Sequence, residues 1–303
     1  MSPRVSIIIP MYNESAIIEK TLSSLVSYLD GRFAQEYELL FVDDGSQDGT
    51  ASVAAALVAE MAKMKAASAA AEGRLLVIGY RDNRGKGAAV REGMLRARGD
   101  VRIFTDCDLA YGTDVLGSFY DALAASAEKA AATSSPRPTD ADVKWEDGLY
   151  PSLQTEAASI TVGADLPDGP QAVDEAFAVF PAIAIGSRDI HEDGYRGYTP
   201  FRRFVSRTYR AILRAFFALP VSDSQCGIKG FTAPAAERIF SVAETNRYAF
   251  DFEIITLATR ARIPIRELPV CVVNNRKSRI RLVRDSARML SDLVKTKRRL
   301  GRK

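Results

Sequence analysis

The first third of the chain alternates short apolar runs with longer segments of helical periodicity. Apolar runs of strand length lie at 5–10, 37–44, 74–80 and 101–108. Segments with the apolar spacing of amphipathic helices lie at 14–29, 49–64 and 86–98. Continuous apolar strands separated by such helices predict an α/β fold, with a mostly parallel sheet and helices on both faces.

The regular pattern stops at 125–175, where Ala, Ser, Pro and Asp dominate and periodicity is lost. We interpret this segment as an insertion, in part disordered. Order resumes with a buried strand within 176–188. Further helices are predicted at 201–218, 233–244, 250–262 and 279–299, with a strand at 265–273. The predicted organisation is one domain over 1–275 that contains the insertion, followed by a basic amphipathic C-terminal helix over 276–303.

Composition excludes several classes of protein. The chain has 303 residues, of which 47% are hydrophobic and 26% charged, as expected for a folded globular protein. Three cysteines do not make a disulfide framework, and they favour a reducing, cytoplasmic location. A single histidine, His191, excludes a histidine-rich metal site and disfavours a Ser-His-Asp triad. Because no stretch of 18 apolar residues occurs, we expect no spanning helix.

Charge is unevenly distributed along the chain. The net charge is +3, yet residues 276–303 carry 12 basic and 2 acidic side chains, and residues 1–275 are therefore net acidic. A basic tail favours phosphates, and we expect its partner to be an anionic membrane surface. A nucleic-acid partner is not expected, because the acidic body offers no matching basic surface.

Two acidic residues stand at the end of the fourth predicted strand. Asp106 and Asp108 are two positions apart, which on a strand places both carboxylates on the same side. Oxygen ligands of this kind suit Mg²⁺ or Mn²⁺, and the cation is commonly shared with a diphosphate. The alternative is that both acids cap the next helix.

Two further clusters sit at predicted strand ends. Asp43 and Asp44 could accept hydrogen bonds from a base or ribose, or they could belong to a turn in which Ser46 or Asp48 caps the following helix. Lys86, between two glycines at a helix start, could reach a nucleotide or its phosphate. A plain glycine-rich turn explains that segment equally well.

The order and spacing of these motifs resemble glycosyltransferase family 2, and the later motifs resemble its dolichyl-phosphate glucosyltransferase branch. The motifs that carry the resemblance are Pro10-Met11-Tyr12-Asn13-Glu14, Asp43-Asp44-Gly45-Ser46, Asn83-Arg84-Gly85-Lys86-Gly87, Asp106-Cys107-Asp108, Gly186-Ser187-Arg188, Asp223-Ser224-Gln225-Cys226-Gly227-Ile228-Lys229 and Arg247-Tyr248-Ala249-Phe250-Asp251. The resemblance covers about residues 5–275 apart from the insertion, and it implies the GT-A fold, a Rossmann-like sheet that binds a nucleotide-diphosphate sugar.

The resemblance also implies roles for individual residues. A nucleotide-sugar pocket would be lined by Pro10, Tyr12, Glu14, Asp43, Asp44, Lys86 and Asp106. Asp106 and Asp108 would hold Mg²⁺ or Mn²⁺. An acceptor phosphate would meet Arg188, Arg202, Arg203 and Lys229. The reaction centre would contain Asp223, Gln225 and Asp251.

Two positions depart from the family pattern. Mannosyl relatives often have Gln as an extra metal ligand where this chain has Ala110, and close glucosyl relatives have Trp where it has Tyr248. Relatives often carry N-terminal or C-terminal membrane anchors, which we do not expect in this chain, so membrane attachment would depend on amphipathic helices or on a separate membrane protein partner. In helix 201–218 aromatic residues gather opposite a narrow arginine arc, which suits an interfacial helix or a helix packed on the sheet. In the C-terminal helix Val294 would lie on the apolar face and Arg299 on the basic face, and a solvated basic tail is the alternative.

The expected activity is inverting transfer of glucose from UDP-glucose to polyprenyl or dolichyl phosphate, by a protein peripheral on the inner face of the membrane. The acceptor phosphate is already anionic near pH 7, so no strong base is required. If the acceptor were a sugar or glycolipid hydroxyl, Asp223 or Asp251 would be the base. Two further hypotheses are a GDP-mannose-dependent mannosyltransferase and a catalytically silent nucleotide-sugar sensor.

Overall fold

The computed structural model describes residues 3–34, 36–67, 74–133, 181–195, 219–247, 249–273 and 293–299. The elements are β1 (Val5–Met11), α1 (Ile18–Phe33), β2 (Tyr37–Asp44), α2 (Thr50–Ala67), β3 (Arg74–Tyr80), α3 (Lys86–Arg96), β4 (Val101–Phe104), α4 (Asp114–Thr133), β5 (Ile183–Ser187), β6 (Lys229–Thr232), α7 (Ala233–Phe240), α8 (Phe250–Arg260) and β7 (Ile265–Pro269). A further short helix spans 293–299. None of the helices that the structure describes has the length and apolar character needed to span a bilayer.

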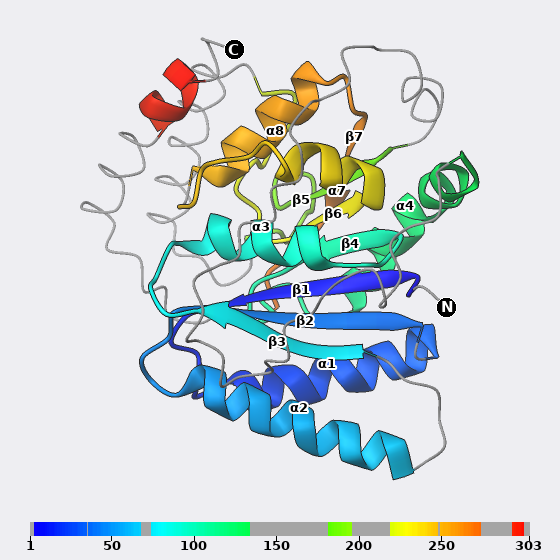
Figure 1. Cartoon of the computed structure of the whole chain (residues 1–303). Coiled ribbons are helices and arrows are strands. Elements are labelled where there is room, and N and C mark those ends of the chain that lie inside the picture. The colour runs from blue at the N-terminus through cyan, green and yellow to red at the C-terminus, as the bar shows by residue number, and fades with distance from the viewer. Residues whose placement is uncertain are drawn as a thin grey trace.

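Seven strands form one sheet in the order β3-β2-β1-β4-β6-β5-β7 (Figure 1). Strands β1 to β4 pair in parallel, and β5 pairs in parallel with β7. Strand β6 runs antiparallel to both neighbours, β4 and β5. The mostly parallel α/β sheet predicted from the sequence is therefore confirmed, with one reversed strand that the pattern did not predict.

Side chains alternate between the two faces of the sheet. On β1, Ile7 and Ile9 pack with residues of α1, α2 and α4 in one apolar core, whereas Ile8 packs with α3, α7 and α8 in another. Figure 1 shows α1 and α2 below the sheet and α3, α7 and α8 above it. Both faces are covered, which explains why β1, β2 and β4 are buried at nearly every position and mostly apolar.

Several predicted boundaries change in the structure. Strand β4 ends at Phe104, so Asp106 and Asp108 lie beyond it in a turn where Leu109 has φ of +47°. The insertion was predicted to begin at residue 125, but α4 continues to Thr133. The hydroxyl of Ser126 on α4 donates to the carbonyl of Pro181 (2.7 Å), just before β5. Residues 134–180 and the predicted helix 201–218, with Arg202 and Arg203, lie outside the described residues.

The C-terminal helix differs from its predicted orientation. Leu293 and Thr296 are buried, whereas Val294, predicted on the apolar face, is 41% exposed. Leu293 packs with Ala249 and Phe252 at the start of α8. The apolar face of this turn of helix is therefore directed at the protein.

The turn after β2 gives a test of local stability. Asp48 accepts hydrogen bonds from the N–H and hydroxyl of Thr50, where α2 begins, and from the N–H (3.1 Å) and hydroxyl (2.8 Å) of Ser15. Burial alone would raise the pKa of Asp48, but these hydrogen bonds together outweigh it and lower that pKa to about 2. Asp48 therefore holds the first N–H of α2, from one position before the N-cap, which is Gly49 rather than the predicted Ser46 or Asp48.

We predict that Asp48→Asn lowers the free energy of unfolding by about 1 kcal/mol at neutral pH, a typical value for a helix cap at a solvent-screened site. The folded pKa is depressed below the unfolded value of about 3.9, so the stabilisation is complete above pH 4 and is lost as pH falls towards 2. Urea unfolding of both proteins between pH 2 and pH 7 measures the difference. A difference that did not change with pH would contradict this assignment.

Candidate active site

The carboxyl ends of β1, β2 and β4, here called the site edge, lie where the strand order reverses. Chain order runs outward from β1 to β2 and β3 on one side and to β4 on the other, and ligands of open α/β sheets bind at such a point. Because β6 is antiparallel to β4, with Lys229 opposite Phe104, the loop that precedes β6 arrives at the same edge. Strand β5 ends there too, since Ile185 also pairs with Lys229. Segments far apart in the sequence thus meet at one place.

Asp44 shapes the glycine-rich turn that follows β3. Its Oδ1 accepts the N–H groups of Arg84 (2.8 Å) and Gly85 (3.0 Å), and its Oδ2 accepts the side-chain amide of Asn83 (2.9 Å). Burial raises the pKa of Asp44, while the N–H donors and the Tyr80 hydroxyl act against that rise. This carboxylate, predicted to line the nucleotide pocket, therefore fixes the turn from which Lys86 projects.

The loops after β1 and β2 are joined by hydrogen bonds. The N–H of Asn13 donates to the hydroxyl of Ser46 (2.9 Å), and the N–H of Glu14 donates to the hydroxyl of Thr50 (2.7 Å). Asp43 is buried and accepts the N–H of Ser46 (3.0 Å).

Pro10 and Glu14 are half-buried beside this seam, and the ring of Tyr12 is 43% exposed. An exposed aromatic ring beside fixed backbone suits the face of a nucleobase.

Lys86 and the two predicted metal ligands form one charge cluster. The ammonium of Lys86 contacts Oδ1 of Asp106, while Oδ1 of Asp108 accepts the N–H of Ala110 (3.1 Å). Burial, followed by the nearby charge of Asp106, raises the pKa of Asp108. Burial lowers the pKa of Lys86, but Asp106 and Asp251 more than offset this effect and raise it. The prediction that Asp106 and Asp108 share one face of a strand is wrong, because both lie in the turn after β4. The turn nevertheless brings the two carboxylates close enough to influence each other.

The donor set suits a hard divalent cation. Two carboxylates are available, and among the described residues no group of three or more His, Cys, Asp or Glu side chains is arranged to hold a metal. Mg²⁺ is typically held by one or two carboxylates, with substrate phosphates completing its shell. Asp106 and Asp108 therefore fit a cation that arrives with a diphosphate, rather than one held in a closed protein cage.

A buried ion pair lies behind this cluster. Lys229 is fully buried, and its ammonium donates to Oδ1 of Asp251 (2.6 Å) and to the carbonyl of Cys226 (2.7 Å). Burial raises the pKa of Asp251, whereas Lys229 and Lys86 act to lower it. The sequence led us to expect Lys229 at an acceptor phosphate. In the structure its ammonium instead contacts Asp251 and the Cys226 carbonyl in the protein interior.

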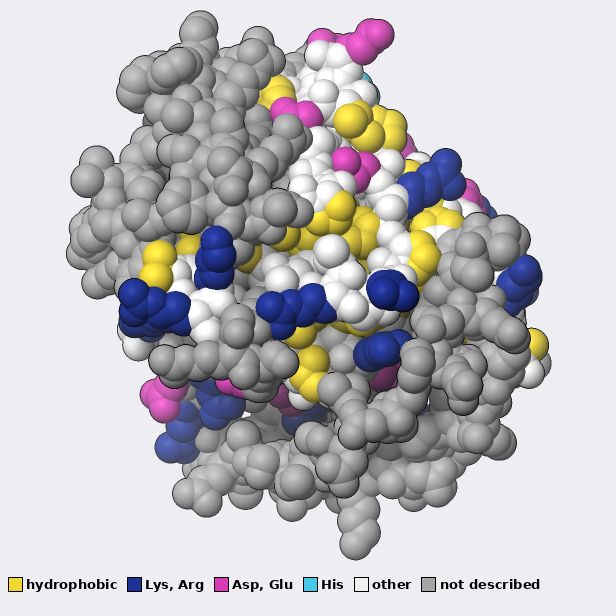
Figure 2. Space-filling model, turned by 90° about the horizontal axis from the view of Figure 1, so that it is seen from above, with side chains coloured by type: hydrophobic (Ala, Val, Ile, Leu, Met, Phe, Trp, Pro, Cys, Tyr) yellow, Lys and Arg dark blue, Asp and Glu magenta, His cyan; other side chains and the backbone are white. Residues whose placement is uncertain are grey.

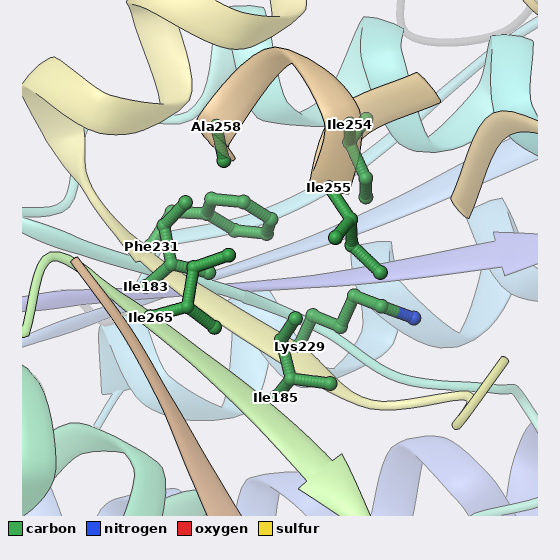
Figure 3. Close-up of a pocket in the computed structure, with 8 residues that line it drawn as sticks. All are labelled: Ile183, Ile185, Lys229, Phe231, Ile254, Ile255, Ala258 and Ile265. Carbon is green, nitrogen blue, oxygen red and sulfur yellow. The ribbon is translucent and has the colours of Figure 1, made fainter. Parts of the chain in front are cut away.

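An apolar cavity explains the path of the Lys229 side chain. Figure 3 shows the lysine stem among isoleucines of β5 and α8, with its nitrogen extending beyond them. The cavity has no room for a water molecule. The ammonium must therefore find its partners in the protein, and it does so in Asp251 and the Cys226 carbonyl.

Arg188 and Asp223 form a second buried pair. Oδ2 of Asp223 accepts the Nε of Arg188 (2.6 Å), and Oδ1 accepts its Nη2 (2.8 Å). Asp223 is fully buried, which is unfavourable for a base that must meet a substrate. The geometry suits a carboxylate that orients the arginine.

The neighbouring turn is held from β7. Oε1 of Glu267 accepts the N–H (2.7 Å) and the hydroxyl (2.5 Å) of Ser222. Gln225 is half-buried in the loop that follows. Glu267 was not identified from the sequence, since only the antiparallel pairing of β6 brings this loop beside the edge strand.

Two further residues were also missed. A Cβ on Gly227 would lie 2.2 Å from Oδ2 of Asp106, so any side chain there would force that carboxylate to move. The N–H of Gly227 donates to the hydroxyl of Tyr111 (3.3 Å), just after the Asp108 turn. The motif that contains Gly227 was recognised, but its contact with Asp106 depends on strand pairing.

Comparison with known proteins identifies the family. A model of glycosyl transferase family 2 matches residues 6–158, about half of the chain, and it includes β1 to β4 with Asp106 and Asp108. The chain belongs to glycosyl transferase family 2. The resemblance drawn from its motifs is thereby confirmed.

This glycosyltransferase is similar over most of its length to dolichyl-phosphate beta-glucosyltransferases. It is 28% identical to the Saccharomyces cerevisiae protein over 292 residues, which cover 96% of this chain and 73% of that protein. It is 29% identical to the Drosophila melanogaster protein over 274 residues, which cover 89% and 67% of the two chains. These likenesses extend beyond the part matched by the family model into α8 and β7.

Solved structures share its fold. Mannosyl-3-phosphoglycerate synthase from Rubrobacter xylanophilus aligns with a TM-score of 0.54 at 17% identity, covering 99% of this chain and 74% of that one. Glucosyl-3-phosphoglycerate synthase from Mycobacterium tuberculosis, in complex with Mn²⁺, UDP-glucose and phosphoglyceric acid, aligns with a TM-score of 0.53 at 16% identity, covering 97% and 79%. The expected GT-A fold is confirmed.

We predict that Gly227→Ala weakens Mn²⁺-dependent binding of UDP by roughly tenfold or more, because the new methyl group must displace the carboxylate of Asp106. Titration calorimetry with UDP and Mn²⁺ measures the change. Gly31→Ala is the matched control, since a Cβ there meets nothing within 4 Å. Wild-type affinity in a folded Gly227→Ala protein would contradict the placement of Gly227 against Asp106.

Proposed function

We propose that this family 2 enzyme transfers glucose from UDP-glucose to a polyprenyl or dolichyl phosphate, with inversion at the anomeric carbon. The observation that carries the proposal is the likeness to dolichyl-phosphate beta-glucosyltransferases over nearly the whole chain. The cluster of Asp106, Asp108 and Lys86 at the site edge supports a diphosphate donor.

The donor would lie along the site edge. We assign Pro10, Tyr12, Glu14, Asp43 and Asp44 to the nucleoside side of the pocket. Lys86 would release Asp106 and turn to the diphosphate, which supplies its negative charge in return. Mg²⁺ or Mn²⁺ held by Asp106 and Asp108 would neutralise charge that develops on the leaving diphosphate.

The acceptor would approach from the side of β5. At that side the structure describes one basic side chain at the end of β5, that of Arg188. Asp223 fixes its guanidinium through two hydrogen bonds, so Arg188 could bind a phosphate without losing its orientation. We extend the same role to Arg202 and Arg203, which lie outside the described residues. Lys229 is assigned instead to holding Asp251 at the donor, and Gln225 remains a candidate at the reaction centre.

The chemistry requires little from a general base. A phosphate monoester has a second pKa of about 6, so the acceptor oxygen is anionic near pH 7 and attacks directly. Asp251 and Asp223 are both held by cations and buried, which favours structural and electrostatic roles over proton removal. The burial of Asp223 and Asp251, the two candidate bases, supports a phosphate acceptor over a hydroxyl.

We predict that Asp108→Ala abolishes transfer of glucose to polyprenyl phosphate, because one of the two oxygen ligands is lost. A radiochemical assay with UDP-glucose and Mn²⁺ or Mg²⁺ measures turnover. Asp121→Ala is the control, since Asp121 on α4 forms an exposed ion pair with Arg32 on α1, away from the site edge. Full turnover by Asp108→Ala would contradict the metal assignment.

The same assay separates the alternative substrates. GDP-mannose replaces UDP-glucose in one arm, and a glycolipid with a free hydroxyl replaces polyprenyl phosphate in another. We expect activity only with UDP-glucose and polyprenyl phosphate. Transfer to the hydroxyl acceptor alone would overturn the proposed acceptor.

We also propose that the protein reaches its lipid by binding an anionic membrane surface on the cytoplasmic side. Figure 2 looks onto the side of the molecule where α8 and the C-terminal helix lie, and lysine and arginine side chains are grouped there around hydrophobic ones. The strongly basic composition of residues 276–303 also supports binding to an anionic surface.

We predict that the full chain binds vesicles that contain phosphatidylserine and is released as the salt concentration rises, because each basic residue at the surface contributes about 1 kcal/mol and salt screens it. Sedimentation with vesicles measures the bound fraction. Vesicles of phosphatidylcholine alone are the control. Equal binding to both lipids at low salt would remove the electrostatic mechanism.

A further inference from the structure

The C-terminal helix is fixed to the protein at the start of α8. Besides the packing of Leu293, the hydroxyl of Thr296 lies 3.2 Å from that of Thr245, within hydrogen-bonding distance. Thr245 belongs to segment 244–247, which connects α7 to α8. The last described turn of the chain therefore contacts a segment about fifty residues earlier.

Arg299 is the main polar contact of this helix. Its guanidinium contacts Oε1 of Glu253, and it donates to Oε2 of Glu244 (3.0 Å) and to the hydroxyl of Thr245 (3.0 Å). The side chain of Glu253 is only 1% exposed. A buried carboxylate is costly without a counter-charge, and Arg299 supplies one.

Glu253 in turn holds the backbone of segment 244–247. It accepts the N–H of Glu244 (3.1 Å) and that of Thr245 (2.6 Å). Asp251, the partner of Lys229, lies two residues before Glu253 in the same first turn of α8. One carboxylate thus fixes the segment that leads into the active-site turn of α8.

Segment 244–247 packs directly against the glycine-rich turn of the donor site. The carbonyl of Asn246 accepts the N–H of Ala88 (3.2 Å). A Cβ on Gly85 would lie 2.4 Å from that carbonyl oxygen, and a Cβ on Gly87 would lie 2.5 Å from the carbonyl oxygen of Thr245. The segment is therefore the surface on which the turn carrying Lys86 rests.

We propose that Arg299 is a positioning residue for the donor site. It acts through Glu253 and segment 244–247 on residues 85–88, and so on the direction in which Lys86 projects towards Asp106. The proposal rests on the function assigned above, in that a nucleotide diphosphate binds at this turn. It gives the C-terminal helix a role within the donor site in addition to any contact with a membrane.

The test uses the full chain in solution, without vesicles. We expect Arg299→Gln to weaken Mn²⁺-dependent UDP binding roughly fivefold to tenfold in calorimetry, within the range of couplings carried by packed contacts. The KM for UDP-glucose rises by a similar factor, while the KM for polyprenyl phosphate stays unchanged. Arg299→Lys recovers part of the affinity.

Arg298→Gln is the matched control, because Arg298 is an exposed neighbour with the same charge. Hydrogen exchange without nucleotide gives a readout that does not depend on the substrate. Amides of residues 85–88 exchange faster in Arg299→Gln than in Arg298→Gln. Removing the stranded acid as well, in Glu253→Gln/Arg299→Gln, restores part of this protection.

UDP affinity and exchange at 85–88 that match the wild type in a folded Arg299→Gln protein would overturn the proposal. Equal effects of Arg298→Gln and Arg299→Gln would also overturn it, since they would reflect lost charge alone. A wild-type protein that binds UDP but does not glucosylate polyprenyl phosphate would overturn the proposed acceptor and leave the role of Arg299 intact.

Discussion

Carboxylates gathered at the edge of a sheet must have positive charge near them, and much of this molecule is arranged to supply it. Asp106 is met by Lys86, Asp251 by Lys229 and Asp223 by Arg188. Each pair is formed between segments that are distant in sequence, so the folded chain is required to complete it. Of these cations, Lys86 is the one that leaves its carboxylate in the proposed mechanism when substrate arrives, while the buried Lys229 stays.

The side chains proposed to bind the donor are therefore distinct from the buried side chains that hold the site in place. Lys86, Asp106 and Asp108 lie half-buried at the site edge, where a substrate can reach them. Lys229 lies on β6, in the interior, and its side chain is fully buried. Preorganised charge of this kind loses little energy to rearrangement during a reaction.

The sequence predicts the first half of the fold closely, because buried parallel strands are written as continuous apolar runs. The bounds of β2 and β3 agree with the predicted 37–44 and 74–80. The prediction of element bounds and buried faces fails where they depend on contacts with distant parts of the chain. Strand β4 ends at Phe104, before the Thr-Asp-Cys-Asp segment that the prediction had included in the strand, and Val294 is exposed because the helix packs through Leu293 instead. The motifs supply the candidate site residues, but the partners of Asp223, Asp251 and Glu253 follow from the antiparallel register of β6 and the docking of the last helix, which no short motif encodes.

The junction between Ser126 and Pro181 has a consequence for engineering and for evolution. Strand β5 begins just after Pro181, and its opposite end carries Ser187 and Arg188 to the site edge. The contact between α4 and the residue before β5 therefore lies on the side of the sheet away from the catalytic groups. Additions between these two points would lengthen the connection at little entropic cost. A fluorescent protein or affinity module could be fused at this position, and related enzymes are free to differ there in length while keeping the same reaction.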